Sequence, residues 1–185
     1  MESNQRVAHE GGIVPNIEVF DRLIDNIILE KTSHNQGCWI TDHTNVFTIN
    51  AEDRWSCATS ACAAGFVWLA EAPPDSVFDS DRESVYSFED HRKMLDLLRK
   101  ANTLYDRDDY YNGDAVQDEA KALGVPISTW AGEVLGINHS DAMFLFYNFD
   151  GTTETLRRLR HLRNGGHYND YDNITPLDYC NIDDD

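Results

Sequence analysis

The sequence predicts a mainly α-helical α+β protein, in which a single-domain helical bundle surrounds one buried central helix. The first reason is a stretch without any charged side chain, residues 57–70. The second is a series of segments on both sides of it whose apolar residues recur at the helical period. The third is a pair of short runs, residues 38–40 and 46–49, whose β-branched and aromatic side chains favour a small β-hairpin.

Composition and hydropathy predict three segments along the chain. Hydrophobic residues make up 41% of the 185 residues, which is enough for one packed core, so we expect one globular domain over residues 16–163. Residues 1–15 are expected to be flexible. Residues 164–185 form an acidic, tyrosine-rich tail that we expect to be loose or docked as a strap rather than helical.

The first predicted helix spans residues 17–31, with Asn16 as its N-cap and apolar residues at positions 17, 20, 23, 24, 27 and 28. The hairpin follows it. The central helix is predicted from Thr59 to about Glu71, with Thr59 or Ser60 as its N-cap and Pro73 as its stop. Its small residues allow close approach of neighbouring elements, and most of its buried area comes from Phe66, Trp68 and Leu69.

A polar loop is expected over residues 73–86, after which Ser87 caps an amphipathic helix to residue 105, with Asp90 at the capping-box position. A loop over 106–114 leads to a short helix that starts near Asp114 and ends at residues 124–126. We expect the 87–105 helix and the helices of 114–147 to pack over the central helix.

The remaining helices are predicted from their caps. Ser128 is expected to cap a helix that ends at Gly136, and Ser140 to cap a helix over residues 141–147. Thr152 or Thr153 is expected to cap the last helix, which ends near residue 163.

The charge balance is strongly acidic. Fifteen Lys and Arg residues stand against 33 Asp and Glu, a net charge of −18. Such a surface repels nucleic acid and anionic membranes and favours a basic protein partner. A surface selected for solubility explains this charge most simply, and mimicry of a nucleic-acid phosphate array is the sharper alternative.

Three features predict a cytoplasmic protein. No apolar run reaches the ~18 residues of a membrane span, and the polar N-terminal segment lacks the apolar region of a signal peptide. The four cysteines, Cys38, Cys57, Cys62 and Cys180, are too few for a disulfide scaffold and fit reduced thiols.

Cys57 and Cys62 are the first candidate site. A cysteine at a helix N-terminus has a lowered pKa, so Cys62 could act as a nucleophile with a histidine brought in by folding. Residues 61–67 are similar to the helix start of some cysteine peptidases, although with one extra residue before the glycine. The simpler interpretation is two buried thiols. A zinc site is disfavoured because no second Cys/His pair stands out.

Residues 108–119 are a second candidate, a twelve-residue calcium loop with Asp108 at position 1, Asn112 at position 5 and Glu119 at position 12. Tyr110 stands at position 3, where a carboxylate is expected, so an ordinary acidic loop is the preferred interpretation. We therefore expect no metal and no cofactor, with Asp108, Asn112 and Glu119 as the alternative metal ligands.

Two further segments suggest nucleic-acid contacts. Residues 119–135 are patterned like a helix-turn-helix, but Glu133 occupies a core position and the second helix has no Lys or Arg, which favours a packed helical hairpin. Residues 157–163 hold four of the 15 basic residues. They could bind RNA or an acidic partner, but we expect them to pair with this chain's own carboxylates.

Trp55, the run from Cys57 to Gly65, and the later Leu135-Gly136 and Ala142–Phe146 segments together carry a resemblance. They are similar to a family of uncharacterised actinobacteriophage and bacterial proteins with the pattern Cys-Gly-Thr-x-x-Cys-x-Ala-Gly. Ala58 departs from the family's glycine, and the last motif is shifted in register. The match covers about a third of the chain. It implies a phage-encoded cytoplasmic protein and implies no activity.

The sequence thus predicts a phage-encoded, acidic, non-enzymatic binding or inhibitory protein that acts on a host protein with a basic surface. Counter-defence, host takeover and nucleic-acid mimicry are all compatible with it. We expect no direct contact with nucleic acid or membrane, and a homo-oligomer is compatible with the sequence. A small cysteine-dependent hydrolase using Cys62 is one alternative, and a protein that binds a small nucleotide signal is another.

Overall fold

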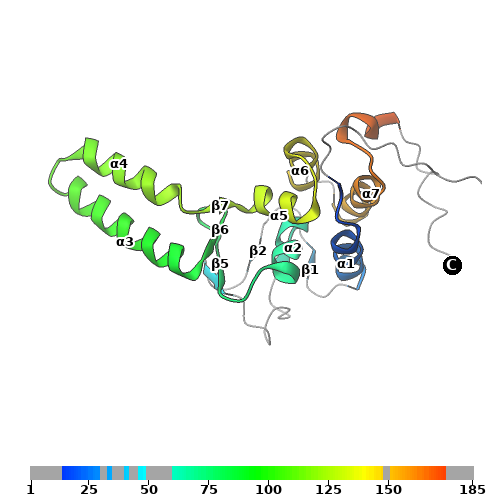
Figure 1. The fold of residues 1–185 in the computed structure, drawn as a ribbon, viewed down its shortest axis with the longest axis horizontal. Coiled ribbons are helices and arrows are strands. Elements are labelled where there is room, and N and C mark those ends of the chain that lie inside the picture. The colour runs from blue at the N-terminus through cyan, green and yellow to red at the C-terminus, as the bar shows by residue number, and fades with distance from the viewer. Residues whose placement is uncertain are drawn as a thin grey trace, which may run out of the picture.

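The computed structural model describes residues 14–29, 33–34, 40–41, 46–48, 60–147 and 151–173. Within them the protein is mainly helical with small β-sheets, which confirms the predicted fold class. The helices are α1 (Ile17–Ile28), α2 (Ala63–Glu71), α3 (Phe88–Tyr105), α4 (Tyr110–Lys121), α5 (Ile127–Leu135), α6 (His139–Phe146), α7 (Gly151–Arg163) and the 3-10 helix η1 (Tyr168–Asn173). The strands are β1 (Ser33–His34), β2 (Ile40–Thr41), β3 (Val46–Thr48), β4 (Ser60–Ala61), β5 (Ser76–Asp79), β6 (Ser84–Ser87) and β7 (Val125–Pro126) (Figure 1).

The strands form two sheets, and the predicted hairpin of residues 38–40 and 46–49 is wrong. Strand β2 pairs with β4 in a sheet of order β1-β4-β2, whereas β3 joins β5 in an antiparallel sheet of order β3-β5-β6-β7. Runs of two or three residues are too short to hold a hairpin by themselves, so each adds to a neighbouring strand instead. Residues 38, 39 and 49 lie outside the described residues.

Residues 73–86 are not the expected polar loop, because β5 and β6 form a hairpin within them. Four side chains of this hairpin, Val77, Phe78, Val85 and Tyr86, are buried. The Asp- and Ser-rich residues that suggested a loop occupy its turn, where Glu83 has a positive φ of 50°.

Helix α2 is the buried central helix. All seven residues from Ala63 to Leu69 are buried, as expected. Its N-cap is Cys62 rather than Thr59 or Ser60, because pairing of β4 with β1 and β2 holds Ser60 in extended backbone; Thr59 lies outside the described residues. Helices α1, α5 and α6 pack against α2, and α7 covers α1. We call α1, α2, α5, α6 and α7 the body.

Helices α3 and α4 form an antiparallel hairpin, which we call the arm, and it projects away from the body (Figure 1). The prediction that α3 packs over the central helix is therefore wrong. Helix α4 begins at Tyr110, earlier than expected, and Gly113 lets it approach α3 closely. A Cβ atom at Gly113 would lie 2.5 Å from the Tyr105 ring.

Several predicted caps are confirmed and several are shifted by one or two residues. Asn16 and Ser87 cap α1 and α3 through their side chains, and Gly136 ends α5 in left-handed backbone with φ 65°. In contrast, Ser128 lies inside the first turn of α5, and Asn138 rather than Ser140 caps α6. Asparagine caps as well as serine does, so the sequence offered two adjacent choices.

Two helix ends also differ from prediction. Helix α1 ends at Ile28 instead of continuing to residue 31. Helix α7 begins at Gly151, so Thr152 and Thr153 lie in its first turn rather than at its cap. The strap, residues 164–173, continues from α7 and packs its 3-10 helix against α6 and α7.

Candidate functional site

The tip of the arm, residues 106–111, gathers exposed aromatic and acidic side chains. Tyr110 is 60% exposed and Tyr111 is 85% exposed, on the first turn of α4. Asp106 and Asp108 are exposed and Asp109 is half-buried, so these three acids outnumber the single base of the tip, the exposed Arg107. Tyrosines left in water at the end of a projecting hairpin contribute nothing to the core, so the tip is the best candidate contact surface in the described residues.

Short-range hydrogen bonds hold the carboxylates of the tip in place. The Tyr110 hydroxyl donates to Asp108 Oδ1 at 3.2 Å, and the Asn112 amide donates to both oxygens of Asp109 at 3.0 and 2.9 Å. Asp108 has a positive φ of 59°, a conformation that costs a non-glycine residue free energy, although Asp tolerates it better than most. The tip therefore presents its acids in one preferred arrangement.

The base of the arm contains a buried polar cluster that sequence reasoning missed. Asp79 on β5 is 2% exposed and accepts hydrogen bonds from Arg82 Nη1 at 2.7 Å and from the Asp81 backbone at 3.1 Å. His91 Nε2 on α3 lies 3.8 Å from Asp79 Oδ2, beyond hydrogen-bond distance, and the His91 ring meets the Tyr86 ring edge-on. The cluster ties α3 to the β5–β6 hairpin.

Burial governs the titration of this cluster. Desolvation lowers the pKa of His91, against the opposing pull of Asp79. Desolvation also raises the pKa of Tyr86. Asp79 and His91 lie on separate elements, twelve residues apart. The contact could have been predicted only by first recognising the β5–β6 pairing.

Cys62 lies in the body core and is 1% exposed. Cys62 is the N-cap of α2 rather than a residue of its first turn, and it belongs to the packed apolar core. This placement supports the interpretation of Cys62 as a core thiol. Cys38, Cys57 and Cys180 lie outside the described residues.

Asp108, Asn112 and Glu119 do not form a calcium loop. The calcium-loop alternative is wrong because α4 begins at Tyr110 and carries both Asn112 and Glu119. Those two residues are seven positions apart on a helix, a rise of about 10 Å, so they cannot converge on one ion. Glu119 Oε1 instead lies 3.9 Å from Lys93 Nζ on α3. Nowhere in the described residues do three or more His, Cys, Asp or Glu side chains form a group that could hold a metal ion.

Residues 119–135 form neither a helix-turn-helix nor a packed helical hairpin. Helix α4 packs against α3 in the arm, whereas α5 packs against α2 and α6 in the body. The connecting residues Val125 and Pro126 form β7 and pair with β6. Glu133, at the position where a helix-turn-helix needs an apolar residue, is exposed.

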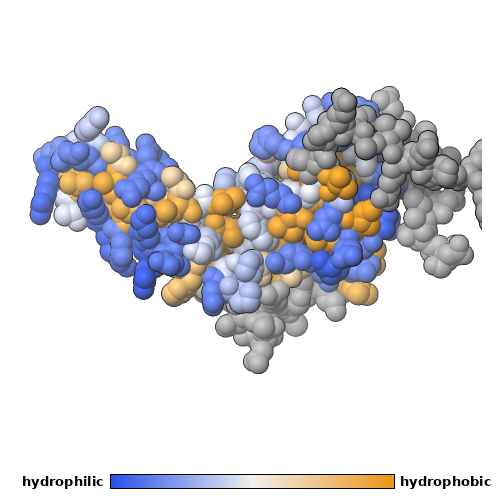
Figure 2. Space-filling view, viewed as in Figure 1, coloured by the Kyte–Doolittle hydropathy of each residue, from blue (hydrophilic) through white to orange (hydrophobic). Residues whose placement is uncertain are grey.

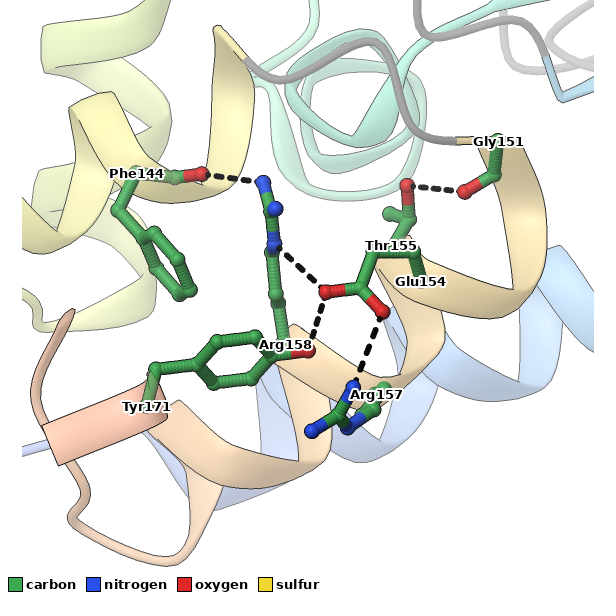
Figure 3. Close-up of polar contacts among 7 residues, drawn as sticks. All are labelled: Phe144, Gly151, Glu154, Thr155, Arg157, Arg158 and Tyr171. Carbon is green, nitrogen blue, oxygen red and sulfur yellow. Dashed lines mark hydrogen bonds and ion pairs between the residues drawn. The ribbon is translucent and has the colours of Figure 1, made fainter. Parts of the chain in front are cut away.

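The arginines of α7 pair with carboxylates and rings of this chain, as predicted for the basic cluster. Arg158 is 6% exposed, donates to Glu154 Oε1 at 3.3 Å and to the Phe144 carbonyl at 3.0 Å, and lies over the Phe144 and Tyr171 rings (Figure 3). Arg157 also donates to Glu154. Arg163 donates to both carboxylate oxygens of Asp21 on α1.

The strap is anchored by two acidic residues. Asp141 of α6 is 2% exposed and accepts from the Tyr168 backbone at 2.9 Å, while His167 Nδ1 lies 2.9 Å from its other oxygen. The buried Tyr171 hydroxyl donates to Glu154 Oε1 at 2.5 Å, and desolvation together with this bond raises the pKa of Tyr171. These contacts make the start of the tail part of the packed structure.

Comparison with known proteins gives no family for this chain. No protein-family model matches it, and neither curated proteins nor solved structures give a match. None of the described helices has the length and apolar character needed to cross a membrane.

Proposed function

We propose that this chain is a non-enzymatic binding protein, phage-borne and cytoplasmic, that acts by covering a basic surface of a host protein. The tip of the arm is the surface that makes the contact. The observation that carries the proposal is the combination, at one projecting end, of two strongly exposed tyrosines with three aspartates.

The chemistry of the tip suits arginine and lysine side chains. A guanidinium group binds a carboxylate through two parallel hydrogen bonds, and the face of a tyrosine ring attracts a cation. Tyr110 and Tyr111 supply rings beside the carboxylates of Asp106, Asp108 and Asp109. If the host protein binds nucleic acid, these carboxylates take the place of phosphates.

The distribution of basic residues supports the same proposal. Arg157, Arg158 and Arg163 are among the 15 basic residues, and their charges are directed to Glu154 and Asp21 of the same chain. A basic cluster engaged internally leaves the exterior acidic. An acidic exterior accelerates and selects encounters with basic partners.

The experiment is affinity capture from a bacterial host lysate, followed by measurement of binding to the captured protein in purified form. We expect the Kd to rise by about tenfold or more between 50 and 500 mM NaCl, because the contact is between charges. Salt-insensitive binding would exclude the electrostatic contact.

Variants locate the contact. The double variant Tyr110→Ala/Tyr111→Ala should weaken binding by about tenfold or more, since exposed aromatic anchors dominate interfaces of this kind. Tyr168→Ala is the matched control, because Tyr168 is also exposed, at 43%, but lies on the strap. Equal binding by the tip variant and the unmodified protein would place the contact elsewhere.

A further inference from the structure

The arm carries an apolar stripe that its own two helices leave half-buried. Leu97 and Leu104 are seven residues apart and so lie on one side of α3. Val116 lies on α4, and Leu123 follows two residues after the end of this helix and packs against the core of the arm. The Lys93–Glu119 ion pair shows that the Leu97 side of α3 lies next to the Glu119 side of α4. Lys93 precedes Leu97 by one turn, and Glu119 lies between Val116 and Leu123. We call Leu97, Leu104, Val116 and Leu123 the stripe.

Two helices alone cannot cover such a stripe. Only Met94, Ala101 and Ala120 are fully buried apolar residues between α3 and α4, and the leucines around them remain half-buried. Figure 2 shows apolar residues along the arm between strongly hydrophilic ones, well away from the body. A stable helical bundle normally closes such a face with a further pair of helices.

The borders of the stripe carry opposite charges. Helix α3 has four basic residues against three acidic ones, and its Lys93 and Lys100 border the stripe. Helix α4 has one basic residue against three acidic ones, and its Glu119 borders the stripe. The stripe thus has a basic edge along α3 and an acidic edge along α4, and the partner it fits is an amphipathic helical surface whose charged edges lie in the opposite order.

We propose that this partner is a second copy of the chain. In a two-fold pair, the stripes of two arms meet and α3 of one copy lies over α4 of the other, so that four helices enclose one core. The lysine edge of α3 then faces the acidic edge of the partner's α4. The arm projects from the body, so its helices are accessible to a second copy (Figure 1).

The proposed dimer interface is no longer than helix α3, and this length limits the affinity that we expect. An 18-residue helix such as α3 is about 27 Å long. An interface of that length falls at the small end of specific contacts, so we expect a Kd in the micromolar range. The dimer leaves the tips outside the stripe and does not depend on the proposed host contact.

Sedimentation equilibrium of the purified full chain, from about 1 to 200 µM, tests the proposal. We expect a monomer–dimer equilibrium that persists when NaCl is raised from 50 to 500 mM, because the stripe is apolar and because salt screens the repulsion between two chains of charge −18 as well as the attraction between the charged edges. The proposed host contact weakens over the same range, so failure of one does not imply failure of the other. A monomer at every concentration and salt level would overturn the dimer.

Two variants place the contact on the stripe. Leu104→Glu should abolish the dimer, with the helical content checked by circular dichroism because Leu104 also packs within the arm. Lys100→Glu changes only an exposed residue and should weaken the dimer by about three- to tenfold. Arg92→Glu is the matched control, because it makes the same charge change at a position roughly 120–140° around α3 from Leu97 and Leu104. Equal loss in Lys100→Glu and Arg92→Glu would contradict docking through the stripe.

Discussion

The body and the arm are built from similar helices and differ in how completely they are enclosed. Helix α2 has seven consecutive buried residues and is surrounded by α1, α5 and α6, whereas α3, twice as long, has only His91, Met94 and Ala101 fully buried. The body therefore stabilises itself by apolar burial. The arm is a projecting hairpin with little core of its own, which suits a part of the molecule that contacts other proteins.

A cavity in the body should produce the largest loss of stability. Phe66 of α2 is fully buried at 0% exposure, and Phe66→Ala should lower the free energy of unfolding by about 3–5 kcal/mol. Phe88→Ala is the control, since Phe88 at the start of α3 is 58% exposed and should cost about 0.5 kcal/mol or less. Chemical denaturation measures both. Equal losses would mean that the body core is not the main source of stability.

A cavity in the arm should cost less and act locally. Met94 is 1% exposed, and Met94→Ala should lower stability by about 2 kcal/mol, near the lower end for such a change, because its small core can collapse. Hydrogen exchange should show faster opening of α3 and α4 amides while those of α2 stay protected. Uniform acceleration across α2 and α3 would show that arm and body unfold as one unit.

In both regions the sequence predicted where the helices begin and end better than it predicted which elements pack against each other. The caps Asn16 and Ser87 and the stop at Gly136 are local signals, so α1, α3 and α5 were placed closely. The apolar residues of α3 recur at the helical period whether the helix packs on α2 or on α4. The sequence pattern therefore could not predict that α3 and α4 form a separate arm. The repeated pattern of Ser76–Asp79 and Ser84–Ser87 was a signal for the β5–β6 hairpin that composition concealed.

The candidate site was predictable only in part. The prediction that the arginines of α7 pair with carboxylates of the same chain is confirmed. It followed from the net charge, because a chain with 33 acids places carboxylates near most arginines. Residues 108–119 are interpreted from the sequence as an ordinary acidic loop with a calcium loop as the alternative, yet helix α4 starts at Tyr110 and separates the residues that could have been ligands. The pairing of Asp79 with His91 depends on tertiary contacts that periodicity does not contain.

Loss of one hydrogen bond should loosen the strap without affecting the arm. Tyr171→Phe removes the hydroxyl that donates to Glu154, a bond to a charged acceptor, and should cost about 1.5 kcal/mol. The amide of Tyr168, which donates to Asp141, should exchange faster in this variant. Tyr168→Phe is the control and should change neither quantity, because the Tyr168 ring is exposed. Unchanged exchange in Tyr171→Phe would show that Asp141 alone holds the strap.

The smallest effect concerns the joint between arm and body, where His91 packs against Tyr86 and Asp79. Burial lowers the pKa of His91, so the folded state binds a proton at this ring less tightly than the unfolded state does. The stabilising contribution is therefore complete above the ordinary histidine pKa of about 6.5 and is lost progressively as pH falls through that value toward the lower folded pKa. The effect is modest because the attraction of Asp79 for the protonated ring opposes desolvation.

The measurement is the free energy of unfolding at pH 7.5 and pH 5.5, for the unmodified chain and for His91→Gln. The difference between the two pH values should shrink in His91→Gln, because its side chain binds no proton in this range. His139→Gln changes an exposed histidine of the body and should leave the difference closer to that of the unmodified chain. An equal difference in His91→Gln and the unmodified chain would mean that His91 at the joint between arm and body does not contribute to the pH dependence of stability.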